Sequence, residues 1–320
     1  MKIGMVTDSL GGLSFEAVLD AAAGLGLDCV EFATGNWSTA PHIDLDGLLA
    51  SKPARDRFMA AVRDRGLTVS ALTCNGNSLH PGPSGAEHDK VVRKTIELAP
   101  KLNIDHVVLM SGCPGAPGDK YPNWITVAWP PESTQVLEWQ WEKVLIPYWR
   151  KLVAFAGRKG VRHLCLELHG GQNVYNVSTL TRLRDACGET VGVNFDPSHL
   201  MWMGADPIAA VEALGAAIFH VHAKDTRIDP RNAALDSRIE TRPSVLASER
   251  SWNYVTLGYG HGDDFWRAFC LALRRAIYDG VLSIEHEDMA MSPMEGMRKS
   301  VELLRRVIIV EPASYDLPKI

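Results

Sequence analysis

Short apolar runs typical of strands alternate with longer amphipathic segments typical of helices along the whole 320-residue chain. Eight strands are expected, at residues 2–7, 29–33, 68–74, 106–110, 163–168, 191–196, 218–223 and 281–285. Eight helices are expected after them, at residues 15–24, 54–65, 87–101, 137–158, 178–186, 207–214, 264–277 and 294–307. Strict alternation requires a parallel sheet, and eight such units predict a single α/β domain, a closed (β/α)8 TIM barrel. An open doubly wound sheet is the alternative, but the first strand is not followed by the GxGxxG motif.

The predicted barrel domain covers residues 1–310, and residues 311–320 are expected to form a C-terminal extension. Two connections are too long for tight turns: residues 111–133 after the fourth strand and residues 224–262 after the seventh. We expect the first to be a functional loop or lid, and the second is polar and holds Trp252, Tyr254 and His261.

Charge and composition exclude several classes of protein. A net charge of -5 gives no basic surface for nucleic acid or an anionic membrane. No apolar run reaches the roughly 18 residues of a membrane span, and the N-terminus lacks a signal peptide's apolar stretch. The six cysteines include no CxxC pair, which favours reduced thiols in a cytoplasmic protein.

Each of the last four predicted strands ends in a residue able to bind a metal ion. These residues are Glu167, Asp196, His222 and Glu285. Active sites of barrels lie at the C-terminal ends of the strands, and neighbouring strands are about 4.8 Å apart. The four side chains can therefore meet around one ion. Three carboxylates and one imidazole suit Mn2+ best, with Mg2+, Co2+ or Zn2+ as alternatives.

Period-two alternation places further residues around this predicted centre. Glu167 and His169 share a face of their strand, so His169 either transfers a proton near neutral pH or orients Glu167. His220 and His222 also share a face. His222 lies nearer the end of the strand and is the better ligand, whereas His220 is expected to be a supporting or core histidine.

Five other side chains are candidates for binding substrate. His199 lies one turn beyond Asp196, where it could hydrogen-bond a sugar hydroxyl or a carbonyl. Lys224 and Arg227 could neutralise an enolate, or they are charges on the rim. Trp124 and Trp252 could contact a sugar or aryl ring, or they pack inside the long loops.

The segments LELHGGQ, NFDPSHL, HVHAKD and SIEHED, in this order and at barrel spacing, together resemble the xylose-isomerase-like TIM-barrel superfamily of sugar phosphate isomerases and epimerases. The resemblance implies that Glu167, Asp196, His222 and Glu285 hold a divalent metal, commonly manganese. It implies that the two glutamates shuttle a proton and that His199 contacts substrate. The expected activity is isomerisation or epimerisation of a keto sugar or keto-glycoside, by α-proton abstraction through a metal-bound enediolate.

The run Glu167-Leu168-His169 departs from the ketose epimerases, which often have proline after the glutamate. It is more similar to the catalytic subunits of C-glycoside deglycosidases, lyases that cleave the sugar–aryl C–C bond of a 3-keto-glucoside. That alternative implies a small β-rich partner subunit, whereas a homo-oligomer is the other expected assembly. The acidic balance argues against a phosphodiesterase of the endonuclease IV type, and the intact ligand set argues against a non-catalytic sugar-binding protein.

Overall fold

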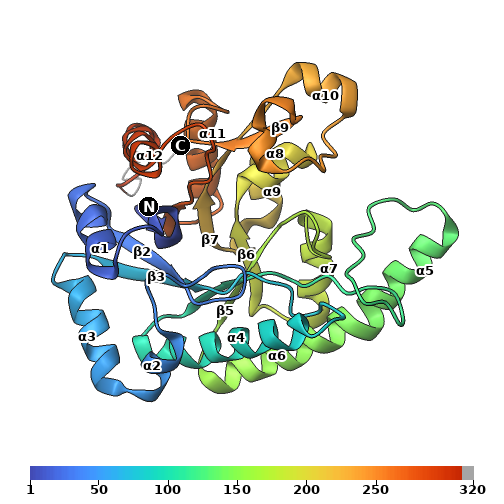
Figure 1. Cartoon of the computed structure of the whole chain (residues 1–320), viewed down its shortest axis with the longest axis horizontal. Helices are drawn as coiled ribbons and strands as arrows, with labels where there is room; N and C mark the ends of the chain where they lie inside the picture. Colours follow the sequence, from blue (N-terminus) through green and yellow to red (C-terminus); the bar gives the residue numbers. More distant parts are fainter. Residues whose placement is uncertain (312–320) are drawn as a thin grey trace, which may run out of the picture.

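Eight parallel strands form a closed barrel in the computed structural model, which describes residues 1–311 (Figure 1). Around the barrel the strands follow the order β1-β10-β7-β6-β5-β4-β3-β2. Their bounds are β1 Lys2–Val6, β2 Cys29–Ala33, β3 Thr68–Thr73, β4 His106–Leu109, β5 His163–Glu167, β6 Val191–Phe195, β7 Ile218–Ala223 and β10 Val281–Ile284. The predicted fold class is confirmed. The expected extension at 311–320 lies outside the described residues except for its first residue.

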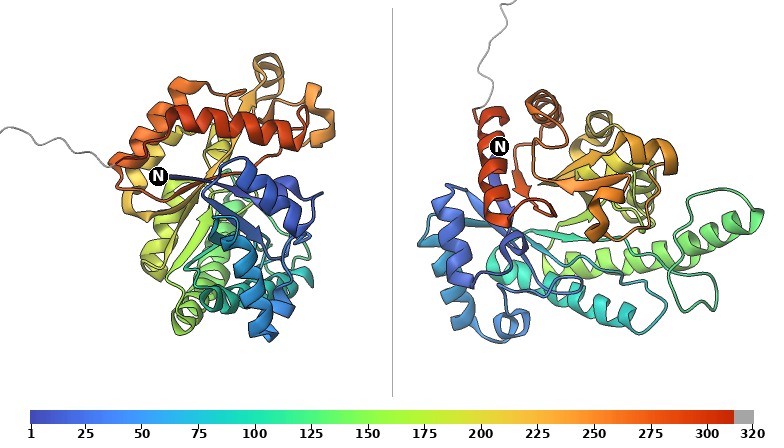
Figure 2. Two further views of the ribbon diagram at one scale, coloured as in Figure 1. Left: turned by 90° about the vertical axis from the view of Figure 1, so that its left-hand side faces the viewer. Right: turned by 45° about the horizontal axis from the view of Figure 1, so that its top comes forward.

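Helices surround the barrel (Figure 2). Their bounds are α1 Phe15–Gly24, α2 Leu45–Ala50, α3 Lys52–Arg63, α4 Ser84–Leu98, α5 Pro131–Trp139, α6 Ile146–Lys159, α7 Val177–Cys187, α8 Pro197–Met203, α9 Pro207–Leu214, α10 Pro230–Asp236, α11 Asp263–Arg275 and α12 Pro293–Val307. N-cap side chains explain where several of these helices begin. Ser14 caps α1 and Asn176 caps α7 by accepting from a backbone N–H, while Asp196 does the same for α8.

The connection after β4 differs from the expected loop in its last residues. Pro131 occupies the first turn of α5, where a missing N–H costs nothing, so the loop ends before residue 133. A π-helical segment, Gln140–Leu145, joins α5 to α6. No residue of α5 is buried, and the helix with its preceding loop projects from the barrel body (Figures 1 and 2).

The connection after β7 is a small lobe rather than a structureless loop. It contains α10 and the antiparallel strands β8 (Asp225–Ile228) and β9 (Trp252–Val255). The lobe stands beside α8 (Figure 1), and the Thr226 hydroxyl donates to the backbone oxygen of Ser198 at 2.9 Å. The structure therefore places the residues that follow β7 against those that follow β6.

The core consists of apolar side chains from the barrel strands and the inner faces of the helices, with Trp149 and Trp266 among its largest members. The six cysteines form no disulfide, and all but the half-buried Cys187 are buried. In the described part of the chain, no helix combines the length and apolar character needed to cross a membrane.

Candidate active site

Three of the four predicted ligands lie together at the C-terminal ends of β5, β7 and β10. The Nδ1 atom of His222 is 3.2 Å from Glu285 Oε2 and 3.5 Å from Glu167 Oε2. One ligand atom from each of the three side chains lies within 4.8 Å of the other two. Glu167 and His222 are buried, and Glu285 is partly accessible.

Asp196, the fourth predicted ligand, reaches the same centre from the end of β6. Its Oδ1 atom accepts a hydrogen bond from the backbone N–H of Ser198 at 2.8 Å, which fixes the carboxylate at the start of α8. Its Oδ2 atom lies 3.2 Å from His199 Nε2 and 4.0 Å from Lys224 Nζ. The structure thus brings together all four residues that the sequence singled out.

The donor set fits a divalent metal ion. Within residues 1–311, Asp196 Oδ2 and His222 Nδ1 are buried side-chain atoms without a hydrogen-bond partner, and buried polar groups rarely stay unsatisfied. Both atoms belong to the carboxylate and imidazole groups that divalent metals take as ligands, and the carboxylates of Glu167 and Glu285 lie beside them. A hard cation would satisfy these atoms and reduce the repulsion between the carboxylates.

Glu31 on β2 is a site residue that the sequence analysis missed. Its carboxylate is fully buried, and its two oxygens accept from His220 Nε2 at 2.7 Å and from His222 Nε2 at 3.0 Å. The Thr73 hydroxyl also donates to it. Burial opposes ionisation of Glu31, but the two imidazoles outweigh burial and lower its pKa well below the usual value. A charged residue inside the apolar strand CVEFA was the available signal.

This contact determines which nitrogen of His222 faces the metal centre. Because Nε2 donates to Glu31, a neutral His222 carries its proton there and presents the lone pair of Nδ1 towards Glu167 and Glu285. His220 is buried and bonds to the same carboxylate from the other side. It supports the centre through Glu31, in line with its expected supporting role.

Glu167 is held by three donors. Its Oε2 atom accepts from Asn75 Nδ2 at 3.0 Å and Asn194 Nδ2 at 3.2 Å, and its Oε1 atom accepts from His199 Nε2 at 3.0 Å. Burial alone would raise the pKa of Glu167, but the hydrogen bond from His199 and the charges of His199 and His222 lower it below the usual value. Asn75 and Asn194 were not predicted as site residues.

His199 is buried between two of the proposed ligands, Glu167 and Asp196. Its Nε2 atom faces both Glu167 and Asp196, and its Nδ1 atom is 2.9 Å from the Tyr254 hydroxyl of β9. Burial alone would lower the pKa of His199, but Asp196 and Glu167 raise it to about 9. His199 is therefore a cation when the centre carries no metal.

His169 lies on the wall of the pocket beside this cluster. Its ring centroid is 4.2 Å from that of His199, and its Nδ1 atom faces the backbone oxygen of Gly170. Burial and the nearby His199 lower the pKa of His169 to about 4. The neutral imidazole is available as a proton acceptor.

Lys224 is buried inside the pocket instead of lying on its rim. Its ammonium group is 3.2 Å from Glu285 Oε2 and 3.1 Å from Glu287 Oε2. It also lies 4.3 Å from the centroid of the Tyr254 ring. Burial opposes the charge, but Glu285 and Glu287 raise the pKa of Lys224 well above its usual value.

A pocket of about 240 Å³ opens above the cluster. Besides Glu167, His169, Lys224, Glu285 and Glu287, it is lined mainly by side chains from the first strands and their loops. These include Asp8, Trp37, Thr73 and Asn75. The predicted site residues lie mostly at the last four strands, whereas one wall of the pocket comes from the first three strands and the loops that follow them.

Three predicted substrate contacts lie away from this pocket. Arg227 on β8 is exposed and lines a different cavity with Asp288. Trp252 is buried in the lobe, where it stacks on Trp202 at 4.8 Å and 7°. For these two residues the structure favours the packing or rim alternatives.

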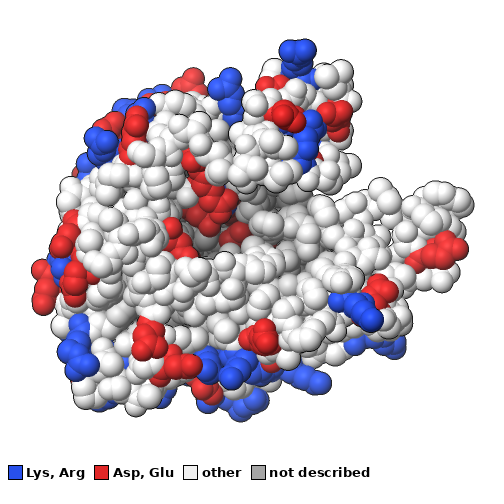
Figure 3. All heavy atoms as spheres, in the orientation of Figure 1, with Lys and Arg blue, Asp and Glu red and all other residues white. Residues whose placement is uncertain are grey.

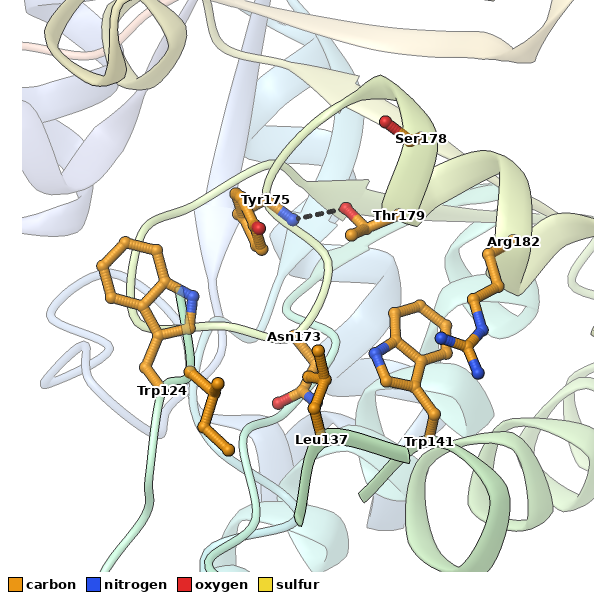
Figure 4. A pocket seen from close by; sticks show the side chains of 9 residues that line it. Trp124, Leu137, Trp141, Asn173, Tyr175, Ser178, Thr179 and Arg182 are labelled. Carbon is orange, nitrogen blue, oxygen red and sulfur yellow. Dashed lines mark hydrogen bonds between the residues drawn. The ribbon is translucent and has the colours of Figure 1, made fainter. Parts of the chain in front are cut away.

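Trp124 lines a second cavity, of about 230 Å³, beside Tyr175 and Leu137 (Figure 4). A Cβ atom added at Gly170 would lie 2.5 Å from Trp202 and 3.4 Å from Trp124, so both indoles pack against the glycine that follows His169. Trp124 therefore supports the active-site wall from behind.

Comparisons with known proteins agree with this architecture. A family model described as a xylose isomerase-like TIM barrel matches residues 19–307. The chain is 49% identical over 311 residues to uncharacterized protein YfiH of Bacillus subtilis, covering 96% of this chain and 99% of that protein. It is 30% identical over 151 residues to inosose dehydratase of Clostridium beijerinckii, covering 47% and 48% of the two chains. The fold is also that of 3-keto-D-glucoside 4-epimerase from E. coli, with a TM-score of 0.65, 18% identity and coverage of 96% and 99%.

Proposed function

We propose that this chain, which belongs to the xylose isomerase-like TIM barrel family, is a divalent-metal-dependent sugar isomerase or epimerase. Its substrate would be a keto sugar or keto-glycoside from which a proton next to the carbonyl is removed. The observation that carries the proposal is the cluster of Glu167, His222 and Glu285 at one end of the barrel, with Asp196 linked to it through His199. Two of these residues, Glu167 and Glu285, line a pocket large enough for a monosaccharide unit.

Glu167, Asp196, His222 and Glu285 would hold the ion, with Mn2+ as the preferred metal. When bound, the ion would supply Lewis-acid polarisation of the substrate carbonyl. The chain's own residues keep this centre rigid: Glu31 fixes His222, and Ser198 fixes Asp196. Rigidity matters because a carbonyl must be presented to a base within hydrogen-bond reach.

Glu167 and Glu285 are the candidates for moving the proton. They reach His222 from different strands, and each carboxylate lies beside its Nδ1 atom. Removal of the proton by one and return by the other, on the opposite face of the carbon, gives an epimer. His169 is a third candidate because its depressed pKa keeps it neutral and it lines the same pocket. Lys224 would stabilise negative charge that develops on the substrate oxygen.

A lyase is the second candidate, because loss of a leaving group follows the same proton abstraction. Two observations favour it. The ammonium group of Lys224 lies in the pocket beside Glu285 and Glu287 and could protonate a leaving oxygen, and inosose dehydratase is a relative. A C-glycoside deglycosidase, which cleaves the sugar–aryl bond of a 3-keto-glucoside, belongs to the same class. The proposal includes a homo-oligomer or a small β-rich partner subunit, and a cytoplasmic location that suits six free thiols.

Proton exchange tests the proposal directly. The Mn2+-loaded protein is incubated in D2O with free ketoses, 2-keto-inositol and 3-keto-glucosides, including an aryl C-glucoside. NMR then follows deuterium uptake, epimer formation and product release. Uptake with epimer or isomer formation, lost in Glu285→Gln, would support the isomerase. Release of water or of the aryl group would support the lyase, and no uptake on any member of the panel would refute both.

A further inference from the structure

We propose that the substrate is an uncharged polyhydroxylated ketone and not a phosphate ester, and that Asp8 and Asn75 select it by accepting hydrogen bonds from its hydroxyl groups. This inference rests on the proposed function and names the substrate class of the same pocket. Two observations support it: acceptor atoms in the pocket wall that lack hydrogen-bond partners, and the excess of carboxylates in the pocket lining.

Asp8 supplies the first free acceptor. It follows β1 in the 3-10 turn Thr7–Leu10 and lines the pocket. Its Oδ2 atom accepts from the Ser38 hydroxyl, which holds the carboxylate in place. Its Oδ1 atom is buried and has no partner within the described chain. A carboxylate oxygen can only accept, so the group that satisfies it must be a donor such as a sugar hydroxyl.

Asn75 supplies the second free acceptor, at the end of β3. Its Nδ2 atom donates to Glu167 at 3.0 Å, and this contact fixes which way the amide points. Its Oδ1 atom is then left buried with no partner among residues 1–311. Asp8 and Asn75 line the same pocket, so two acceptors face a ligand there, at positions set by protein contacts.

The aromatic face of Trp37 completes this wall. The indole is 55% exposed and lines the same pocket. A flat apolar face beside fixed hydrogen-bond acceptors suits a sugar, whose C–H groups lie on one face of the ring and whose hydroxyls lie at its edge.

The charges of the pocket exclude a phosphate group. Four carboxylates line it, those of Asp8, Glu167, Glu285 and Glu287, and acidic atoms are visible in the central hollow of the space-filling view (Figure 3). Lys224 is the only lysine or arginine in this lining, and its ammonium already contacts Glu285 and Glu287.

A divalent ion adds two positive charges, but its four ligands include the carboxylate of Asp196 as well. Carboxylates therefore still outnumber positive charges in the loaded site. A phosphate monoester, which carries nearly two negative charges at neutral pH, would meet repulsion without a free cation to pair with.

The experiment compares matched pairs of ligands on the Mn2+-loaded chain: D-fructose with its 1-phosphate and 6-phosphate, and 2-keto-inositol with a phosphate monoester of it. Binding is measured by calorimetry, and deuterium uptake is measured in the same samples. We expect each neutral ligand to bind and exchange about 100-fold better than its phosphate.

The variant Asp8→Asn tests the residue. It keeps the shape of the side chain but removes its charge, so neutral ligands should bind about tenfold more weakly and the discrimination against phosphate should narrow by a similar factor. Asp64→Asn is the matched control, because Asp64 is an exposed carboxylate at the end of α3. It should leave both values unchanged.

The possible outcomes separate this inference from the proposed function. Preferred binding and exchange of a phosphate ester would overturn the inference and leave the function standing. Saturable binding of the neutral ligands without exchange would refute the function and support the inference. If no ligand binds or exchanges, both fail, and unchanged discrimination in Asp8→Asn would remove Asp8 from the proposal.

Discussion

The substitution Glu31→Gln tests whether a buried carboxylate on β2 sets the metal affinity of an imidazole on β7. Each oxygen of Glu31 accepts from one Nε2–H group, at 2.7 Å from His220 and 3.0 Å from His222. A glutamine of the same shape has one acceptor oxygen and one NH2 group. Only one of the two imidazoles can then donate to it, and the other must accept at Nε2 and carry its proton at Nδ1.

The expected loss follows from this change of tautomer. If His222 is the ring that changes, its Nδ1 atom holds a proton where it faced Glu167 and Glu285, and it can no longer act as a ligand. If His220 changes, His222 loses a charged partner for a neutral one and becomes less basic. Loss of such a supporting carboxylate typically lowers metal affinity about 10–100-fold, which corresponds to roughly 1.4–2.7 kcal/mol.

Calorimetric titration of the metal-free protein with Mn2+ measures the affinity, and NMR of 15N-labelled histidine in the Zn2+-loaded protein reports the tautomer of His222. Thr73→Val is the matched control because it removes another contact of Glu31 but keeps the carboxylate; its affinity should fall less than threefold or so. Circular dichroism establishes that each variant is folded. A folded Glu31→Gln protein with unchanged Mn2+ affinity and unchanged His222 signals would refute the reasoning, and if it does not fold, His220→Asn loosens the same carboxylate from one side only.

Three further predictions concern stability. In a solution with free Mn2+ at about 100 times Kd, removing the ion with EDTA should lower the free energy of unfolding by roughly 2.7 kcal/mol and Tm by about 5 °C. The change should be smaller in Glu285→Gln, and scanning calorimetry measures both. Burial, together with His220 and His163, lowers the pKa of His106 to about 4, so the unfolded chain binds the proton more readily than the folded one. The free energy of unfolding should therefore fall by up to roughly 3 kcal/mol as the pH drops from about 6.5 to 4. Tm measured against pH should show this fall, and the fall should be smaller in His106→Phe. Trp252→Ala should remove the stack on Trp202 and destabilise the lobe by about 3 kcal/mol. Proteolysis within residues 237–249 should then be faster than in the unmodified protein, whereas Trp252→Phe should be cut at the unmodified rate. Equal cleavage rates in Trp252→Ala and the unmodified protein would contradict this prediction.

The barrel strands could be predicted to within one or two residues at their ends because apolar runs and the helices between them have distinct periods. The proximity of the proposed metal ligands at the ends of β5, β6, β7 and β10 could be expected for a related reason, since the C-terminal ends of parallel strands share one edge. Glu31 could not, because it lies 189 residues from His220 in the sequence. Only closure of the barrel brings β2 across from β7, and no local pattern specifies which buried carboxylate meets which imidazole.

The region after β7 shows where reasoning from sequence position fails. Lys224 and Arg227 lie close in the sequence, and for both the sequence allowed either a role in neutralising an enolate or a position on the rim. Lys224 follows the barrel strand directly and points into the pocket, whereas Arg227 belongs to β8, which leaves the barrel and pairs with β9. The strand pairing is a long-range contact, so the local sequence cannot show that the chain has changed sheets between these residues. The same lobe buries Trp252 behind Tyr254 and keeps it from the pocket.

The two halves of the barrel divide the proposed work. The second half supplies the four proposed metal ligands, while the first half supplies Asp8, Trp37 and Asn75, which line the pocket and are proposed to contact the substrate. Glu31 is the exception, because it comes from the first half but acts on His222. This division predicts opposite effects for two variants: Asp8→Asn should change which ligands bind and leave Mn2+ affinity within about threefold, and Glu31→Gln should weaken Mn2+ binding without altering the preference between a neutral ketose and its phosphate. If both variants changed both properties together, metal binding and substrate selection would be one coupled network, and substrate range could not change in this barrel without disturbing its metal.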